Sequence, residues 1–506
     1  MILRRGFWVF VPFTLLWCLG TGTAFSADEA VRVAANWAKV DRVSKTVISM
    51  EVCVEPPMRR GAPIHDQLFK ALRDLDADYV RYSPWFPYPK LAVAELDPPQ
   101  YGKVHWDFSQ LDPIMEDLTQ ATAGHPIIMN ISTIPEWMFK TERPVSYPAD
   151  PDEIAWDYEQ GSELRDPSQK EVTDYFTRLA SWYMKGGFKD EDGQMHPSDH
   201  HYPVAYWEVL NEVDLEHKMA PEFYTKMYDR IVASLRQVDP KMKFVGMALA
   251  WPGTKPDFFE YFLNPKNHAA GTPLDAISYH FYAFQKGDED PQTMQYEFFA
   301  QADGFLDSVG YMELVRKRLS PKTETFVNEI GSILANATAP KLAKPIPNAY
   351  WNLSGAVFAY VYARLALMGI DMTHGSELID YPGQCAGTNL VDWESGRPNA
   401  RYWVLKLLRD HYGPGDKLVA TSVTFPPEAD TSSVYVQSAE KPDGTREILV
   451  INKRDRNSEV VIAGGAGAHV DVVDQTTSFD PPARRQLDGE KLNLPGFAVA
   501  VVTLAK

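Results

Sequence analysis

Two glutamates end short, strand-like stretches of the sequence, and carboxylates in such places need a reason. Residues 205–214 read Ala-Tyr-Trp-Glu-Val-Leu-Asn-Glu-Val-Asp, so a run rich in β-branched and aromatic residues ends on Asn211 and Glu212. Residues 324–331 read Glu-Thr-Phe-Val-Asn-Glu-Ile-Gly, so a second run ends on Glu329. Because a buried carboxylate without partners is costly, either a salt bridge or chemistry must account for each of them.

A pair of opposed carboxylates is what cleavage of a glycosidic bond requires. One carboxyl group protonates the leaving oxygen, and the other attacks the anomeric carbon. A separation of roughly 5–5.5 Å gives retention through a covalent glycosyl-enzyme, whereas a wider separation admits water and gives inversion. The two pKa values must also differ, so that one group is an acid while the other is ionised.

Strand-like and helix-like stretches alternate between residues 46 and 412. Strands are predicted near residues 50, 80, 128, 207, 245, 278, 326 and 373. Helices are predicted over 64–75, 111–118, 172–185, 221–238, 258–263, 296–319, 349–368 and 401–412. Eight such repeats predict an α/β fold, a closed (β/α)8 TIM barrel. The alternative, an open doubly wound sheet, usually has a glycine-rich first turn, which is missing here.

Polar residues follow most of the predicted strands. They are Arg81, Asn130, Asn211, Glu212, His280, Tyr282, Glu329 and His374. In a barrel, active residues lie at the carboxyl ends of the strands. Because Glu212 ends the fourth strand and Glu329 the seventh, we expect the two carboxylates to meet across the barrel mouth.

The pattern changes after Tyr412. Gly413-Pro414-Gly415 breaks the last helix, and short strands are predicted over 433–437, 447–451, 458–462, 469–473 and 497–504. Hairpin-type turns occur at Asp443-Gly444 and Asp488-Gly489. We predict a barrel over residues 46–412 and a docked antiparallel β-sandwich domain over 413–506, which residues 28–45 join.

Residues 1–27 are typical of a signal peptide. Arg4 and Arg5 precede an apolar core over residues 7–19, and Ala24-Phe25-Ser26 supplies a small-residue exit. The apolar core is short for a membrane span, and no later run reaches that length. We therefore expect an exported protein, periplasmic or extracellular, with no membrane span.

Charge and cysteine content restrict the partners. The formal net charge is -18, and so acidic a surface repels nucleic acid. No Cys/His cluster has zinc spacing, and the sequence has neither a phosphate loop nor a dinucleotide fingerprint, so we predict no metal and no cofactor. Cys53 and Cys385 follow the signal segment, and one disulfide or two free thiols both remain open. The sequence gives no indication of oligomeric state.

Several motifs together resemble a known enzyme family. Trp207-Glu208-Val209-Leu210-Asn211-Glu212 resembles the acid/base strand of clan A glycoside hydrolases, in which Asn-Glu ends the fourth strand. The segments that narrow the resemblance to glycoside hydrolase family 39 are Trp106-Asp107-Phe108 with Leu111-Asp112, Pro126-Ile127-Ile128-Met129-Asn130 and Ile134-Pro135-Glu136-Trp137-Met138. That family includes β-xylosidases and α-L-iduronidases. The resemblance covers residues 46–410 and extends to the trailing β domain.

The resemblance implies a role for each strand-end residue. Glu212 would be the general acid/base and Glu329 the nucleophile, while Asn211 would hydrogen-bond the sugar 2-hydroxyl. Arg81 would hold Glu329 ionised, although a purely structural ion pair is the alternative. His280 and Tyr282 would lie near the nucleophile, where the hydroxyl can orient it.

Two departures from the family affect substrate binding. The residue before Glu329 is Asn328, where family members commonly have Thr, and the eighth strand (372–375) lacks the Trp that seats the sugar ring. Candidate replacements for sugar contacts are Trp137, Trp351, Trp393 and His374. Glu208 has the same strand parity as Glu212, so we expect it to point inward and pair with Arg81 as barrel support.

The predicted function is a retaining exo-glycosidase, similar to the β-xylosidases of this family, with an oligosaccharide or glycoside as its substrate. No basic cluster marks a uronate pocket, which favours neutral pentosides or hexosides. An endo-acting clan A hydrolase and a non-catalytic carbohydrate-binding protein are the alternatives.

Overall fold

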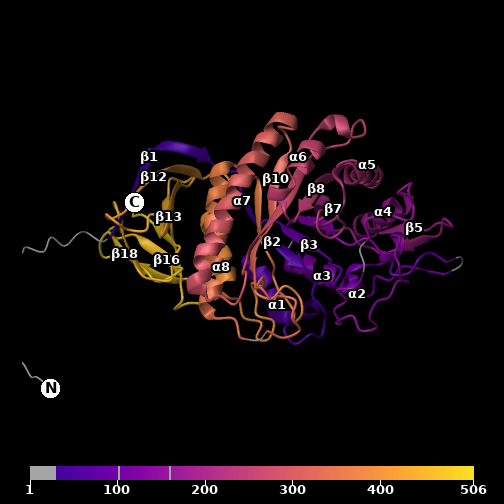
Figure 1. Ribbon diagram of the computed structural model, residues 1–506, viewed down its shortest axis with the longest axis horizontal. Coiled ribbons are helices and arrows are strands. Elements are labelled where there is room, and N and C mark those ends of the chain that lie inside the picture. Colours follow the sequence, from indigo (N-terminus) through magenta and orange to yellow (C-terminus); the bar gives the residue numbers. More distant parts are fainter. Residues whose placement is uncertain (1–29, 101–102, 123, 159–160, 343, 506) are drawn as a thin grey trace, which may run out of the picture.

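A closed barrel of eight parallel strands forms the larger part of the molecule (Figure 1). The computed structural model describes residues 30–100, 103–122, 124–158, 161–342 and 344–505, so the predicted signal peptide lies outside the described residues. The barrel strands are β2 (Val47–Cys53), β3 (Val80–Ser83), β4 (Ile127–Ile131), β7 (Val204–Val209), β8 (Lys243–Leu249), β9 (Ala276–Phe284), β10 (Glu324–Ile333) and β11 (Met372–Gly375). The predicted (β/α)8 fold is confirmed, with one strand at each expected place.

Helices surround the barrel. They are α1 (His65–Leu75), α2 (Pro89–Ala92), α3 (Leu111–Ala121), α4 (Lys170–Lys185), α5 (Pro221–Val238), α6 (Pro256–Phe262), α7 (Pro291–Leu319), α8 (Asn348–Met368) and α9 (Ala400–His411). Short 3-10 turns span Pro56–Met58, Glu136–Met138, Pro252–Thr254 and Pro265–Asn267, and a small hairpin pairs β5 (Gly187–Lys189) with β6 (Met195–Pro197). Most residues of α8 are buried because the helix packs between the barrel and the β domain. None of the described helices has the length and apolarity to cross a bilayer.

The barrel interior is built in layers, because every second residue of a strand points inward. The apolar layer contains Ile128, Tyr206, Val245, Ala276, Phe326 and Met372. Two residues further along five of these strands lie Asn130, Glu208, Ser278, Asn328 and His374, all of them buried. A polar layer therefore separates the apolar core from the mouth of the barrel.

The second domain is a nine-stranded sheet. Its strands are β1 (Val31–Val43), β12 (Lys417–Thr424), β13 (Val434–Glu440), β14 (Arg446–Asn452), β15 (Ser458–Ile462), β16 (His469–Val473), β17 (Ala483–Gln486), β18 (Lys491–Leu494) and β19 (Val499–Thr503). Both halves of the sheet contribute to one apolar core that includes Val33, Val450 and Leu492, so the sheet folds back on itself. The N-terminal β1 pairs antiparallel with β12 but parallel with β15, so the sheet is not wholly antiparallel.

Candidate active site

A cavity of about 400 Å³ opens at the carboxyl ends of the barrel strands. It is lined by Glu51, Cys53, Ser83, Trp85, Phe86, Trp156, Asn211, Glu212, Leu215, Glu216, Ala250, Trp251, Tyr282, Phe284, Glu329, Ile333, Glu377 and Cys385. The cavity therefore contains both glutamates that the sequence singled out, together with Asn211 and Tyr282.

Local backbone irregularities place the two glutamates in the cavity. Leu210 (φ 65°) and Glu212 (φ 40°) adopt left-handed conformations, which break the strand alternation and present Asn211 and Glu212 together. On β10 the register with β9 shifts between Val327 and Glu329, so Glu329 reaches the mouth directly after the inward-pointing Asn328.

Glu212 and Glu329 meet around one imidazole. His280 Nδ1 lies 2.8 Å from Glu212 Oε1 and 3.3 Å from Glu329 Oε2. One oxygen of each carboxylate and a nitrogen of His280 all lie within 4.8 Å of one another. The nearest oxygens of the two carboxylates are thus close enough for a retaining pair, whose carboxyl groups stand roughly 5–5.5 Å apart.

Glu329 is held as an anion. Burial alone would raise its pKa, but His280 and Arg81 outweigh burial, and the net effect lowers the pKa below its ordinary value. Arg81 Nη1 donates to Oε1 at 2.7 Å, and the Tyr282 hydroxyl donates to Oε2 at 2.8 Å. Both oxygens are thus fixed, which orients the carboxylate for attack.

Glu212 has the opposite shift. Burial raises its pKa, the contact with His280 opposes this, and the charge of Glu329 adds to the rise. The pKa of His280 is itself raised: burial works against protonation, but Glu329 and Glu212 together outweigh it. The environment therefore separates the two carboxyl groups into an acid and an anion, as a double-displacement reaction needs.

Arg81 ties the polar layer to the site. Besides Glu329 it donates through Nε to Glu208 Oε2 and through Nη2 to Asn211 Oδ1, both at 2.6 Å. Glu208 also accepts from Asn130 (2.9 Å), Ser278 (2.5 Å) and Asn328 (2.7 Å). Glu208 thus points inward and pairs with Arg81, which links Glu208, Asn211 and Glu329 in one buried hydrogen-bond network.

Glu216 is a site residue that sequence reasoning missed. Its Oε1 accepts from Asn211 Nδ2 at 3.0 Å and from the Trp85 indole at 2.9 Å, so it fixes the Asn211 amide between itself and Arg81. Burial and the neighbouring Glu212 raise its pKa well above the ordinary value. Its place four residues after Glu212, in the loop that follows β7, was the signal that could have identified it.

The four residues expected to replace the strand-eight Trp lie elsewhere. The Trp137 indole donates to Glu95 O at 2.7 Å, and Arg165 lies over its ring. His374 is enclosed in the polar layer, where burial lowers its pKa to about 3. Trp351 is buried on α8, and Trp393 lies against Tyr381 beside a different depression; none of the four lines the cavity.

Other aromatic rings line the cavity instead. Trp85, Phe86 and Trp156 contact one another edge to face, and Trp251 packs against Phe284. Trp156 and Trp251 are more than one-third exposed, so their faces are open to a ligand. Such surfaces suit the stacking of sugar rings. Trp85 and Trp251 each follow a barrel strand closely, β3 and β8, which is the rule that identified the polar residues.

The two cysteines among the described residues, Cys53 and Cys385, are free thiols. Cys53 is buried and Cys385 is partly buried, and both line the cavity. The sequence left open either one disulfide or two free thiols, and the structure has two free thiols.

Comparison by sequence gives limited information. A family model for the C-terminal immunoglobulin-like domain of D-apionate lactonase matches residues 431–502, which lie in the β domain and include no residue of the cavity. No match to a curated protein was found.

Comparison by structure gives the fold. The chain is similar to a glucosidase from Croceicoccus marinus, with 14% identity and a TM-score of 0.58 over 95% of this chain and 100% of that chain. It is also similar to a GH51 arabinofuranosidase from Xanthomonas axonopodis pv. citri (11%, 0.62, 94% and 100%) and to a GH39 β-xylosidase from Caulobacter crescentus (15%, 0.58, 94% and 100%). Because families 51 and 39 both appear at such low identity, the likeness establishes a barrel with a β domain and does not single out family 39.

Proposed function

We propose that this protein is a retaining glycoside hydrolase with Glu212 as general acid/base and Glu329 as nucleophile. The observation that carries the proposal is the pair itself. The two carboxylates share His280, lie within 4.8 Å, and have pKa values shifted in opposite directions. Export is part of the proposal, since residues 1–27 are typical of a signal peptide.

In the proposed double displacement each group has one role. Glu212 gives its proton to the glycosidic oxygen while Glu329 attacks the anomeric carbon and forms a glycosyl-enzyme. Glu212, now ionised, takes a proton from the water that hydrolyses this intermediate. Asn211, clamped by Arg81 and Glu216, presents its amide beside the nucleophile, where it can bind the sugar 2-hydroxyl.

The cavity favours a neutral sugar at the end of a chain. Five glutamates and no lysine, arginine or histidine line it, so the cavity offers no cation to pair with the carboxylate of a uronate. Buried Cys53 and Glu377 form part of its wall.

Given a defined oligosaccharide of the preferred sugar, the enzyme is expected to release monosaccharide only. Early appearance of internal fragments would instead establish endo action, and binding without any hydrolysis would leave a carbohydrate-binding protein.

The acid/base assignment is tested by Glu212→Ala. Loss of the acid/base is expected to lower kcat on nitrophenyl glycosides by about 10²–10⁴-fold, because hydrolysis of the glycosyl-enzyme loses its base. Added azide should restore turnover, because it attacks the glycosyl-enzyme without needing a base, and the product should be a glycosyl azide of retained configuration. Product configuration is read by proton NMR. An azide product of inverted configuration would contradict the proposed roles.

The pH profile provides the control for this variant. In the wild type, kcat/KM should fall at acid pH as Glu329, whose pKa is lowered, becomes protonated. It should fall at alkaline pH as Glu212, whose pKa is raised, loses the proton that it must donate. Glu212→Ala should keep the acid limb and lose the alkaline limb; an unchanged alkaline limb would assign that ionisation to another group.

A further inference from the structure

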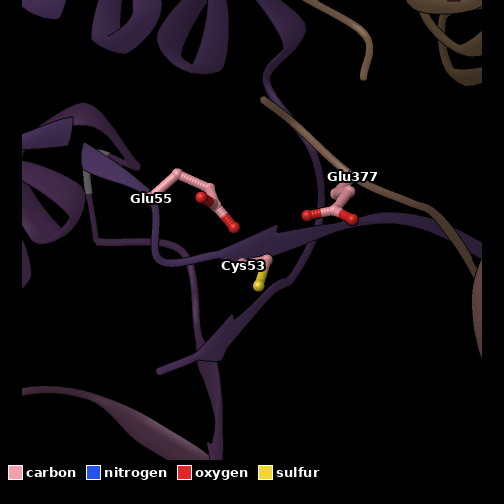
Figure 2. Close-up of side chains that lie close together, drawn as sticks. All are labelled: Cys53, Glu55 and Glu377. Carbon is pink, nitrogen blue, oxygen red and sulfur yellow. The ribbon is translucent and has the colours of Figure 1, made fainter. Parts of the chain in front are cut away.

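A second group of buried acids lies where the first and last barrel strands meet. Cys53 ends β2, Glu55 follows it, and Glu377 follows β11, which pairs with β2. The thiol sulfur and one oxygen of each carboxylate lie within 4.8 Å of one another, and all three residues are buried. Figure 2 shows the carboxylates of Glu55 and Glu377 pointing toward one another across the end of β2.

Three of the four carboxylate oxygens lack a hydrogen-bond partner, and the fourth, Glu377 Oε1, accepts from the Thr388 hydroxyl at 3.2 Å. Neither oxygen of Glu55 has a hydrogen-bond partner although the residue is fully buried, and Oε2 of Glu377 has none either. In the part of the chain that the structure describes, no ion pair includes Cys53, Glu55 or Glu377, and buried Arg401 donates to backbone carbonyl groups instead. The amide of Gln384, which is fully buried, lies beside Glu377.

The size and type of the donors indicate which cation fits. The unpartnered oxygens are shielded from water, so an ion between them must take its ligands from the protein. A metal ion binds oxygen ligands at about 2.0–2.2 Å. Calcium and magnesium prefer oxygen ligands throughout, whereas zinc accepts a thiolate together with carboxylates.

We propose that Cys53, Glu55 and Glu377 form a zinc-binding site. Tetrahedral zinc places two oxygen ligands roughly 3.3 Å apart and a sulfur and an oxygen roughly 3.5 Å apart, which small side-chain rotations can reach from the present spacing. Cys53 and Glu377 also line the cavity, so the ion would lie in the wall of the proposed sugar site. The ion would join the ends of β2 and β11, where the barrel closes. The sequence, by contrast, predicts a protein without a metal.

The test is metal binding by the tag-free, full-length protein, which does not depend on the hydrolase proposal. After removal of metal with a chelator, the wild type is expected to take up one zinc per chain, measured by elemental analysis and by competition with a chromophoric chelator. Zinc should raise its melting temperature, because the ion binds the folded state. Cobalt(II) should give a thiolate-to-metal charge-transfer band in the near ultraviolet, which only a sulfur ligand produces.

Variants identify the ligands. Cys53→Ser, Glu55→Gln and Glu377→Gln are each expected to weaken zinc binding by at least about 100-fold, and Cys53→Ser should also lose the cobalt band. Cys385→Ser is the matched control, because it removes the other cavity thiol, which is outside the cluster, and it should bind zinc as the wild type does. Three results would each overturn the proposal: the stripped wild type does not bind zinc at micromolar concentration, it prefers calcium or magnesium, or Cys53→Ser binds zinc with wild-type affinity. The first result would mean that the buried carboxyl groups share protons instead of a metal ion.

Discussion

Replacement of Glu329 by Gln is expected to abolish glycoside hydrolysis, with a fall in kcat/KM on the order of 10⁴-fold or more. The amide has the shape of the carboxylate but is not a nucleophile, so no glycosyl-enzyme forms. The variant should fold, because Gln still accepts hydrogen bonds from Arg81 and Tyr282 through its amide oxygen. The measurement is kcat/KM across a panel of nitrophenyl glycosides, with circular dichroism to verify the fold.

The control for this variant is Glu222→Gln, the same substitution at an exposed position on α5. It should leave kcat/KM and the melting temperature at their wild-type values. Undiminished turnover in Glu329→Gln would remove the nucleophile assignment and with it the double-displacement mechanism.

Replacement of Arg81 by Met is expected to have the largest effect on stability. It leaves Glu208 buried without a positive partner and Glu329 with His280 alone, which costs about 3–5 kcal/mol in free energy of unfolding. Activity should fall as well, since loss of the guanidinium raises the pKa of Glu329 and moves the acid limb of the pH profile to higher pH. Urea unfolding and the pH dependence of kcat/KM provide the two measurements.

A double variant separates the two roles of Arg81. In Arg81→Met/Glu208→Gln one uncompensated charge is gone, so part of the lost stability should return. Glu329 still lacks its support, so activity should stay low. If Arg81→Met unfolds at the same urea concentration as the wild type, the buried ion pairs do not contribute to stability as expected.

The barrel and its central pair could be predicted because they depend on regular periodicities. Alternation of strand and helix placed all eight barrel strands, and position at a strand end selected Glu212 and Glu329. Strand parity also placed Glu208 inward beside Arg81. In the β domain, by contrast, β12, β17 and β18 were not predicted, and β17 reads Ala-Arg-Arg-Gln with every residue exposed, so no apolar alternation marked it.

The aromatic surface of the cavity was not predicted, because it belongs to loops. Trp85, Trp156 and Trp251 line the cavity from loop positions, and only the folded chain shows which loops meet there. Trp137 follows the strand-end motif yet turns its indole to Glu95. The cluster of Cys53, Glu55 and Glu377 was not predicted for a related reason. Glu377 lies more than 300 residues from the other two, and only closure of the barrel brings the first and last strands together.

The most direct test of the double-displacement mechanism is to trap the covalent intermediate. The purified enzyme is incubated with the activated 2-deoxy-2-fluoro analogue of whichever nitrophenyl glycoside it hydrolyses, and the modified peptide is identified by mass spectrometry. The fluorine slows both steps, and the good leaving group lets the glycosyl-enzyme accumulate. If Glu329 is the nucleophile, each chain should carry one sugar, attached to Glu329. A sugar attached to a different residue, or hydrolysis with inversion and no adduct, would contradict it.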